Sequence, residues 1–201
     1  MKLIVFEGLD GSGKTTLIKD LSAYLTTQGY QTYSIRGLGS TALGEVVRSL
    51  YLNNGQLTPD TRYLLGLAAL RQIEAEILQP LRHQPTLVLS DRWLASNEAY
   101  QRYPYQLTGL IPPALTRPWL TIYLDIDPAL GLVRKQTQLN HQTDVIEQQP
   151  LPYFTQVRAG YWAYFFQQRG HVLILDGALP LTTNFTKIKR YLGGLLRGVN
   201  V

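Results

Sequence analysis

The 201-residue chain contains no cysteine, and none of its runs of consecutive apolar residues approaches the length of a membrane span. The absence of cysteine excludes disulfide bonds and thiolate metal sites. The first apolar run, residues 3–6, is far too short for the hydrophobic part of a secretory signal peptide or for the roughly 20 residues of a transmembrane helix. We therefore expect a cytoplasmic protein with no membrane partner.

Long runs of like charge are also missing, although the chain has 19 basic and 14 acidic residues and a net charge of +5. Without a polybasic segment or a motif that mixes basic and aromatic residues, we expect no nucleic-acid partner. Thirteen of the basic residues are arginine, whose planar guanidinium group suits phosphate. The charge leaves two readings open, an anionic ligand or simply a mildly basic protein.

Short apolar runs alternate with longer helix-compatible segments along the whole chain. Nearly continuous apolar strands separated by helices predict a parallel sheet that is covered on both faces, which is a three-layer α/β fold. No composition change or linker divides the chain, so we expect one domain over residues 1–201. The five expected strands are residues 3–6, 31–35, 86–90, 120–124 and 172–175.

Several helix boundaries are readable. Thr58-Pro59-Asp60 combines a capping hydroxyl, a proline at the first turn and an acidic residue, and predicts a helix that runs to about Arg82. Similar patterns predict helices over residues 129–137 and 152–168. The glutamine-rich segment at about 136–152 lacks apolar periodicity, so it is either a surface loop or a flap over a site.

Residues 8–15, G-L-D-G-S-G-K-T, match the phosphate-binding pattern G-x-x-x-x-G-K-[ST] directly after the first strand, and they open a helix over residues 14–27. Glycines let successive backbone N–H groups point at phosphate oxygens, and the helix adds its positive end. Lys14 can reach the β- and γ-phosphates, and the Thr15 hydroxyl can bind Mg²⁺. The motif predicts a nucleoside-triphosphate site made by Gly8, Leu9, Asp10, Gly11, Ser12, Gly13, Lys14, Thr15 and Thr16.

A second candidate site begins where the third strand ends, at Asp91-Arg92. Ligands of open α/β sheets bind at the carboxyl ends of the strands. There Asp91 can hold the metal or its water together with Thr15, and Arg92 can neutralise a phosphate. The alternative is an exposed ion pair that stabilises the fold by only ~0–1 kcal/mol. The position directly after the buried run 87–89 favours the functional reading.

Four stretches resemble the thymidylate kinase family. Residues 6–16 look like the opening of these kinases, and residues 91–101, D-R-W-L-A-S-N-E-A-Y-Q, are similar to their D-R-Y-x-x-S-x-x-A-Y-Q segment. Residues 124–134 are similar to the segment L-D-x-x-P-E-x-x-L-x-R, and residues 36–45 follow R-E-P-G-G-T-x-x-G-E with losses. The resemblance covers nearly the whole chain. It implies a P-loop kinase fold, with a five-stranded parallel sheet flanked by helices.

The resemblance also implies an activity, which is Mg²⁺-dependent transfer of the ATP γ-phosphoryl group to dTMP, a step in dTTP synthesis, by a homodimer. It assigns catalysis to Asp10, Lys14, Asp91 and Arg92, and adds Arg134 to the ATP side. Arginines and Mg²⁺ must neutralise the anionic donor and acceptor before their oxygens approach in line. The acceptor residues that it implies are Asp10, Arg36, Leu67, Arg71, Arg92, Ser96, Tyr100 and Gln101.

Two arginines, Arg71 and Arg158, each have an alternative structural interpretation. Arg71 could instead form a surface pair with Glu74 on the same predicted helix. Arg158 could face the active site or pair with a carboxylate.

Three positions depart from the family pattern. Gly37 replaces an expected glutamate, and Leu67 replaces an aromatic residue whose stacking on a base is worth about 1–3 kcal/mol. The segment 136–152, which the resemblance identifies as the lid, contains no arginine, and Val145 stands where one is expected. Arg134 and Lys135 at its edge are the substitutes, although lysine lacks the bidentate geometry of arginine. We therefore hypothesise a slow kinase, or an acceptor other than dTMP.

A degenerate nucleotide-binding paralogue without catalysis is the alternative function. The three departures favour it, whereas the intact residues Lys14, Thr15, Asp91 and Arg92 favour an enzyme.

Overall fold

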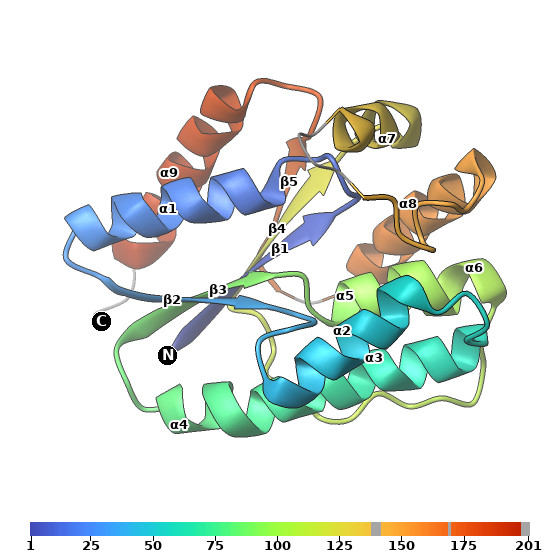
Figure 1. The fold of residues 1–201 in the computed structure, drawn as a ribbon. Coiled ribbons are helices and arrows are strands. Elements are labelled where there is room, and N and C mark those ends of the chain that lie inside the picture. The colour runs from blue at the N-terminus through green and yellow to red at the C-terminus, as the bar shows by residue number, and fades with distance from the viewer. Residues whose placement is uncertain (138–141, 169, 198–201) are drawn as a thin grey trace.

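The computed structural model describes residues 1–137, 142–168 and 170–197. Its centre is a five-stranded, all-parallel sheet with the strand order β2-β3-β1-β4-β5 (Figure 1). Each strand contains one of the runs expected from the sequence and continues beyond it at the carboxyl end. The predicted α/β fold with a parallel sheet is therefore confirmed. The strands are β1 (Lys2–Gly8), β2 (Gln31–Arg36), β3 (Thr86–Asp91), β4 (Leu120–Asp125) and β5 (Val172–Asp176).

Helices cover both faces of the sheet. On one face lie α1 (Lys14–Thr27) and α9 (Leu181–Arg197), and the other face packs against a long helical stretch that starts with α3 (Pro59–Ile73) (Figure 1). That stretch continues through the π-helical turn η1 (Glu74–Leu78) into α4 (Gln79–Leu81), close to the end predicted for this helix. The remaining elements are α2 (Ala42–Asn53), α5 (Leu94–Asn97), the π-helical turn η2 (Glu98–Arg102), α6 (Tyr103–Tyr105), α7 (Pro128–Gln136) and α8 (Leu151–Phe166).

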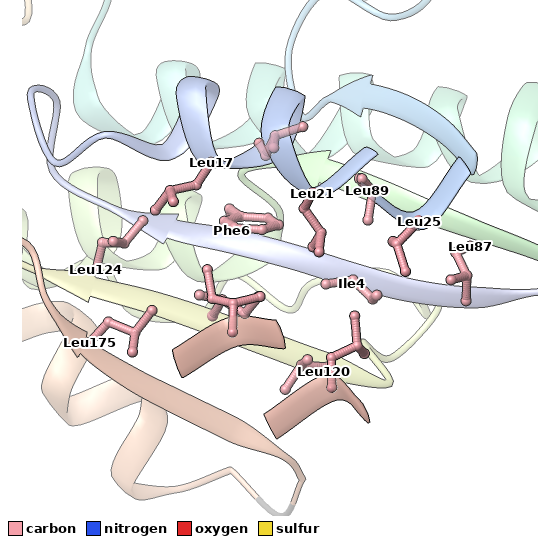
Figure 2. Close-up of a cluster of buried hydrophobic side chains, with 14 residues drawn as sticks. Ile4, Phe6, Leu17, Leu21, Leu25, Leu87, Leu89, Leu120, Leu124 and Leu175 are labelled. Carbon is pink, nitrogen blue, oxygen red and sulfur yellow. The ribbon is translucent and has the colours of Figure 1, made fainter. Parts of the chain in front are cut away.

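Strand β1 shows why both faces are covered. Its side chains alternate between the two faces of the sheet, and almost all of them are buried. Ile4 and Phe6 point toward α1, where Leu17 and Leu21 meet them (Figure 2). Leu3 and Val5 belong to the cluster on the opposite face, which α3 and η1 close. Each such side chain contributes about 1.5–3 kcal/mol when it is fully buried.

Helices α2 and α9 and the helical stretch 94–105 were not predicted. Glycines at 44, 193 and 194 and the proline at 104 weaken the helical pattern of these segments, and tertiary contacts outweigh that weakness. Helix α2 begins with a cap that the sequence does contain, because Thr41 Oγ1 accepts a hydrogen bond of 3.0 Å from the Gly44 N–H. Within the described ranges, no helix combines the length and apolar character that a membrane crossing requires.

Gly160 is the point at which α8 comes closest to η2 and α6. A Cβ atom added there would lie 2.8 Å from the Tyr103 Cβ and 3.1 Å from the Ala99 Cα. We expect Gly160→Ala to lower the free energy of unfolding by about 1–3 kcal/mol, because the helices must separate. The matched control is Gly194→Ala in α9, where nothing lies within 4 Å of the added atom and alanine should stabilise the helix by about 0.5–1 kcal/mol.

Urea unfolding followed by circular dichroism measures both changes. Equal stability of the two variants would show that this close approach does not constrain the fold.

Candidate active site

The glycine-rich loop lies between the end of β1 and the start of α1, as the motif predicts. Gly11 has a φ of +75°, and Gly13, which caps α1, has a φ of +95°. A Cβ atom on Gly11 would lie 2.1 Å from the Gly131 carbonyl oxygen in α7. The loop therefore packs directly against the backbone of α7, and a side chain at position 11 does not fit this arrangement.

Lys14 is buried beneath this loop. Its ammonium group donates to the carbonyl oxygens of Gly8, at 3.1 Å, and Leu9, at 2.9 Å. Burial lowers the pKa of Lys14 to about 8, and the neighbouring Arg92 adds to this effect. Bound phosphate anions would oppose both effects, so the side chain is prepared for an anionic ligand.

A hydroxyl and a carboxylate meet beside Lys14. Thr15 Oγ1 donates a hydrogen bond of 2.8 Å to Asp91 Oδ2, and both residues line the same cavity. Magnesium prefers hard oxygen ligands, and in nucleotide sites it takes one or two from the protein and the rest from phosphates and water. Thr15 and Asp91 fit this requirement.

Arg92 connects the loop to the acceptor side of the cavity. Its backbone has a φ of +73°, which is unusual for a residue with a side chain. Its guanidinium group forms a 2.6 Å ion pair with Asp10 and lies over the Tyr100 ring, 4.9 Å from the centroid. Three further acceptors surround it, namely Gly8 O at 2.9 Å, Ser96 Oγ at 3.1 Å and Tyr161 OH at 2.9 Å.

The Asp10 carboxylate is ionised because of these cations. Burial by itself would raise its pKa, but the charges of Arg92, Lys14 and Lys135 together hold the pKa well below its ordinary value. Asp10 can therefore only accept hydrogen bonds at neutral pH.

Arg36 stands at the end of β2. It donates to Glu45 Oε1 at 3.0 Å and to Gly39 O at 3.4 Å, but more than half of each charged side chain is exposed. Such a pair stabilises the fold by only about 0–1 kcal/mol, so an anionic ligand can replace it.

One cavity of about 1640 Å³ brings the predicted donor and acceptor residues together. Its walls include Asp10, Lys14, Thr15, Arg36, Asp91, Arg92, Ser96 and Tyr100. Arg48 and Tyr51 also line this cavity, and neither was predicted, because helix α2, which carries them, was not predicted either.

Helix α3 presents different residues to the cavity from those expected. Gly66 and Leu70 line it, whereas Leu67 is buried outside the lining and Arg71 is exposed. Each residue is rotated by about 100° from its neighbour, so 66 and 70 share a face that 67 and 71 do not. Gln101 is likewise buried outside the lining.

The surface pair considered for Arg71 does not form among the described contacts. Glu74 is buried, and its two carboxylate oxygens accept from the backbone N–H and the hydroxyl of Thr116, at 2.9 and 2.8 Å. Arg158 pairs with a carboxylate, which is the second of the two interactions considered for it. Its guanidinium group binds both oxygens of Asp125 at 2.7 Å.

Gly37, which replaces the expected glutamate, presses against the chain that follows β3. Its N–H donates to Asp91 O at 2.9 Å, and a Cβ atom would lie 2.9 Å from Arg92 O. A glutamate here requires a shift of the Arg92 backbone.

Part of the expected lid, residues 138–141, lies outside the described residues. Before it, Arg134 donates to Gly177 O at 2.6 Å and Ala178 O at 3.0 Å, and Lys135 forms a 3.7 Å ion pair with Glu147. Both basic side chains line the cavity.

Beyond the gap, the lid contacts α2. The Val145 N–H donates to Leu52 O at 3.0 Å, and its side chain packs with the neighbouring apolar cluster. Asp144 and Ile146 line the cavity on either side of it, whereas Val145 is absent from the lining.

A glycine-rich loop around a buried lysine, a hydroxyl–carboxylate pair and two arginines on one cavity define a P-loop phosphotransferase. Sequence comparison agrees, since the profile of the thymidylate kinase family matches residues 6–188. The chain is 34% identical to the thymidylate kinase of Kosmotoga olearia over 186 residues, which cover 89% of this chain and 88% of that protein.

Two further relatives carry the same name. The thymidylate kinase of Desulforudis audaxviator is 34% identical over 183 residues, covering 86% of this chain and 81% of that protein. That of Anoxybacillus flavithermus is 31% identical over 201 residues, covering 96% of each. The chain belongs to the thymidylate kinase family, and it is a nucleoside monophosphate kinase.

The lowered pKa of Lys14 has a consequence for stability. An unfolded lysine keeps its proton up to pH 10.5, whereas Lys14 in the fold releases it near pH 8, so the unfolded chain binds more protons between these values. The free energy of unfolding of the nucleotide-free protein should rise with pH across this window, relative to that of Lys14→Met, by about 3 kcal/mol in total.

Urea unfolding at intervals from pH 7.5 to pH 10 measures the difference between the two proteins. Parallel pH profiles would show that Lys14 has an ordinary pKa.

Proposed function

We propose that the protein transfers the γ-phosphoryl group of Mg-ATP to dTMP, forming dTDP and ADP for dTTP synthesis. The observation that carries the proposal is the single cavity in which the Lys14 loop faces Arg36 and Arg92. Both reacting nucleotides are anionic, so a shared cavity with cations on both sides is what the transfer requires. We place this activity in the cytoplasm.

On the donor side, the loop from Gly8 to Thr16 would hold the β- and γ-phosphates through its N–H groups and the Lys14 ammonium. Thr15 and Asp91 would hold Mg²⁺, which when bound would neutralise negative charge on the phosphates. Arg134, fixed by the carbonyls of Gly177 and Ala178, would border the nucleoside end of ATP.

On the acceptor side, Arg92 and Arg36 would hold the phosphate of dTMP. A dianionic phosphate competes well with Asp10 and Glu45 for these guanidinium groups, because it offers bidentate geometry and more charge. Asp10, freed from part of its ion pair, would accept from the 3′-hydroxyl of the sugar.

The base would lie between α3 and the segment 96–101. Ser96 and Tyr100 line the cavity, which supports their assignment. Leu67, Arg71 and Gln101 keep their proposed contacts with the base only if α3 or the side chains move when dTMP binds.

The reaction needs no nucleophilic side chain. The two substrates are held so that an oxygen of the acceptor phosphate approaches the γ-phosphorus in line, and electrostatic stabilisation supplies the rest. Nothing among the described residues favours the degenerate alternative, since Lys14, Thr15, Asp91 and Arg92 are all in place.

We also propose a homodimer. Helices α2 and α3 pack side by side (Figure 1). Three exposed apolar side chains lie on α2 at helical spacing. Leu43, Val46 and Leu50 are each more than two-fifths exposed, as is Leu64 on α3. A second copy of the chain would cover this stripe.

A coupled ADP-release assay with a panel of nucleoside monophosphates tests the function. We expect turnover with dTMP and little or none with purine monophosphates, and Lys14→Met should abolish it. ATP binding without turnover on any acceptor would instead support the degenerate reading.

The absence of arginine from the lid leads to two predictions, one for removing a cation and one for adding a cation. Lys135 lines the cavity, so Lys135→Met should lower kcat about 10- to 100-fold by removing a cation near the phosphates. Val145→Arg should raise kcat with dTMP, because an arginine between two cavity-lining residues can reach the phosphates, while lost apolar contacts lower the melting temperature.

Steady-state kinetics with dTMP measure both variants, and Lys187→Met on α9, outside the cavity lining, is the control for removing a lysine. Unchanged kcat in Val145→Arg would reject the idea that the missing charge limits the rate.

A further inference from the structure

Glu7 is a carboxylate buried in the sheet immediately before the phosphate-binding loop. It is 0% exposed, and the alternation of β1 places it on the face that also carries Leu3 and Val5. That face lies toward α5, whose contacts with β1 include this end of the strand. A buried carboxylate destabilises a fold unless hydrogen bonds compensate for the lost water, so its partners should explain why it is there.

Both oxygens of Glu7 accept hydrogen bonds from the region that follows β3. Oε1 accepts from the Trp93 backbone N–H at 2.8 Å. Oε2 accepts from Ser96 Oγ at 2.5 Å and from Tyr161 OH at 3.3 Å. These partners are 86, 89 and 154 residues away in sequence, so Glu7 connects the end of β1 to the start of α5 and to α8.

The two hydroxyl groups that donate to Glu7 also accept hydrogen bonds from Arg92. The guanidinium group of Arg92 donates to Ser96 Oγ at 3.1 Å and to Tyr161 OH at 2.9 Å. A serine hydroxyl has one proton, and Ser96 gives it to Glu7, so its oxygen accepts from Arg92 and, at 2.8 Å, from Tyr161 OH. The ionised carboxylate accepts only, so it fixes the direction of donation from Arg92 through Ser96 to Glu7.

The hydrogen bond from the Trp93 backbone N–H to Glu7 has a separate effect. Arg92 adopts a left-handed conformation that costs free energy for any residue with a side chain, so neighbouring contacts must hold it there. The Arg92 N–H donates to Phe6 O at 2.9 Å, and Ser90 Oγ donates to Arg92 O at 2.6 Å. The Trp93–Glu7 bond holds the next residue, so the turn is fixed on both sides.

We propose that Glu7 is a positioning residue for the acceptor phosphate, because its carboxylate holds the turn at Arg92 and aims the guanidinium group into the cavity. The inference rests on the proposed function in one respect, namely that Arg92 binds the phosphate of dTMP. It assigns Glu7 to the acceptor side, although Glu7 directly precedes the donor loop in sequence.

The protonation of Glu7 offers an independent readout. Burial raises its pKa to about 7, against the opposing effects of Ser96, Arg92, the Trp93 N–H and Lys14. From α8, the uncharged hydroxyls of Tyr161 and Tyr164 face the same group. Below this pH the carboxyl group gains a proton that it can donate to Ser96, and it then resembles a glutamine.

Glu7→Gln is the test. Its carbonyl oxygen can still accept from Trp93, but its NH₂ group donates toward Ser96 and reverses the hydrogen-bond direction. At pH 8 we expect the KM for dTMP to rise about tenfold or more, while the KM for ATP stays within about twofold. The ratio of the two dTMP KM values, variant over wild type, should shrink as the pH falls from 8 to 6.

The matched control is Thr121→Val on β4, a change of similar size at a buried sheet position that makes no hydrogen bond or ion pair with Arg92 among the described residues. It should leave both KM values unchanged. If Glu7→Gln does not fold, Tyr161→Phe tests the same set of hydrogen bonds. It removes one acceptor of the Arg92 guanidinium group while keeping the aromatic ring. It should raise the KM for dTMP about threefold or more, and leave that for ATP unchanged.

The outcomes separate the two claims. A wild-type protein that turns over no dTMP would overturn the proposed function and this inference with it. An active wild type with an unchanged dTMP KM in Glu7→Gln, or in Tyr161→Phe if that variant alone folds, would overturn the inference alone. An equal rise in both KM values would do the same, because it would make Glu7 a support of the donor loop.

Discussion

The site depends on the balance between two cations, the buried Lys14 and the partly buried Arg92, and the few groups that compensate for their charge. Lys14 and Arg92 lie close enough for each to disfavour the charge of the other, and Asp10, Asp91 and Glu7 offset that repulsion. Loop carbonyls and the hydroxyl groups of Ser96 and Tyr161 supply further hydrogen bonds. Phosphate groups can replace the carboxylates as partners of these cations without any new cation, so the cavity has the charge distribution of a nucleotide site. The protein loses some stability by holding these charged groups in place before a nucleotide binds.

The strands and the glycine-rich loop could be predicted from the sequence, because their patterns are local. The five apolar runs identify the strands, and the spacing of Gly8, Gly13 and Lys14 identifies the loop, whose geometry follows from short-range sterics. The orientation of side chains on α3 was not predictable in the same way. Resemblance placed Leu67 and Arg71 at the base, but the register of a helix against a cavity depends on packing, which here turns Gly66 and Leu70 inward.

Long-range polar contacts were also invisible to the sequence. Glu7 reads as one polar residue at the end of an apolar strand, and its partners lie far away in sequence, at the start of α5 (Trp93 and Ser96) and on α8 (Tyr161). The departures from the family pattern have local explanations in the structure. Gly37 leaves room for the Arg92 carbonyl, and Val145 packs with the end of α2. They alter the surroundings of Arg92 and of the lid, while the donor loop keeps its full set of residues.

The contact between Gly11 and Gly131 restricts which parts of the molecule can move independently. Since the loop and the helix meet there through their backbones, without an intervening side chain, a displacement of α7 would move the phosphate-binding turn with it.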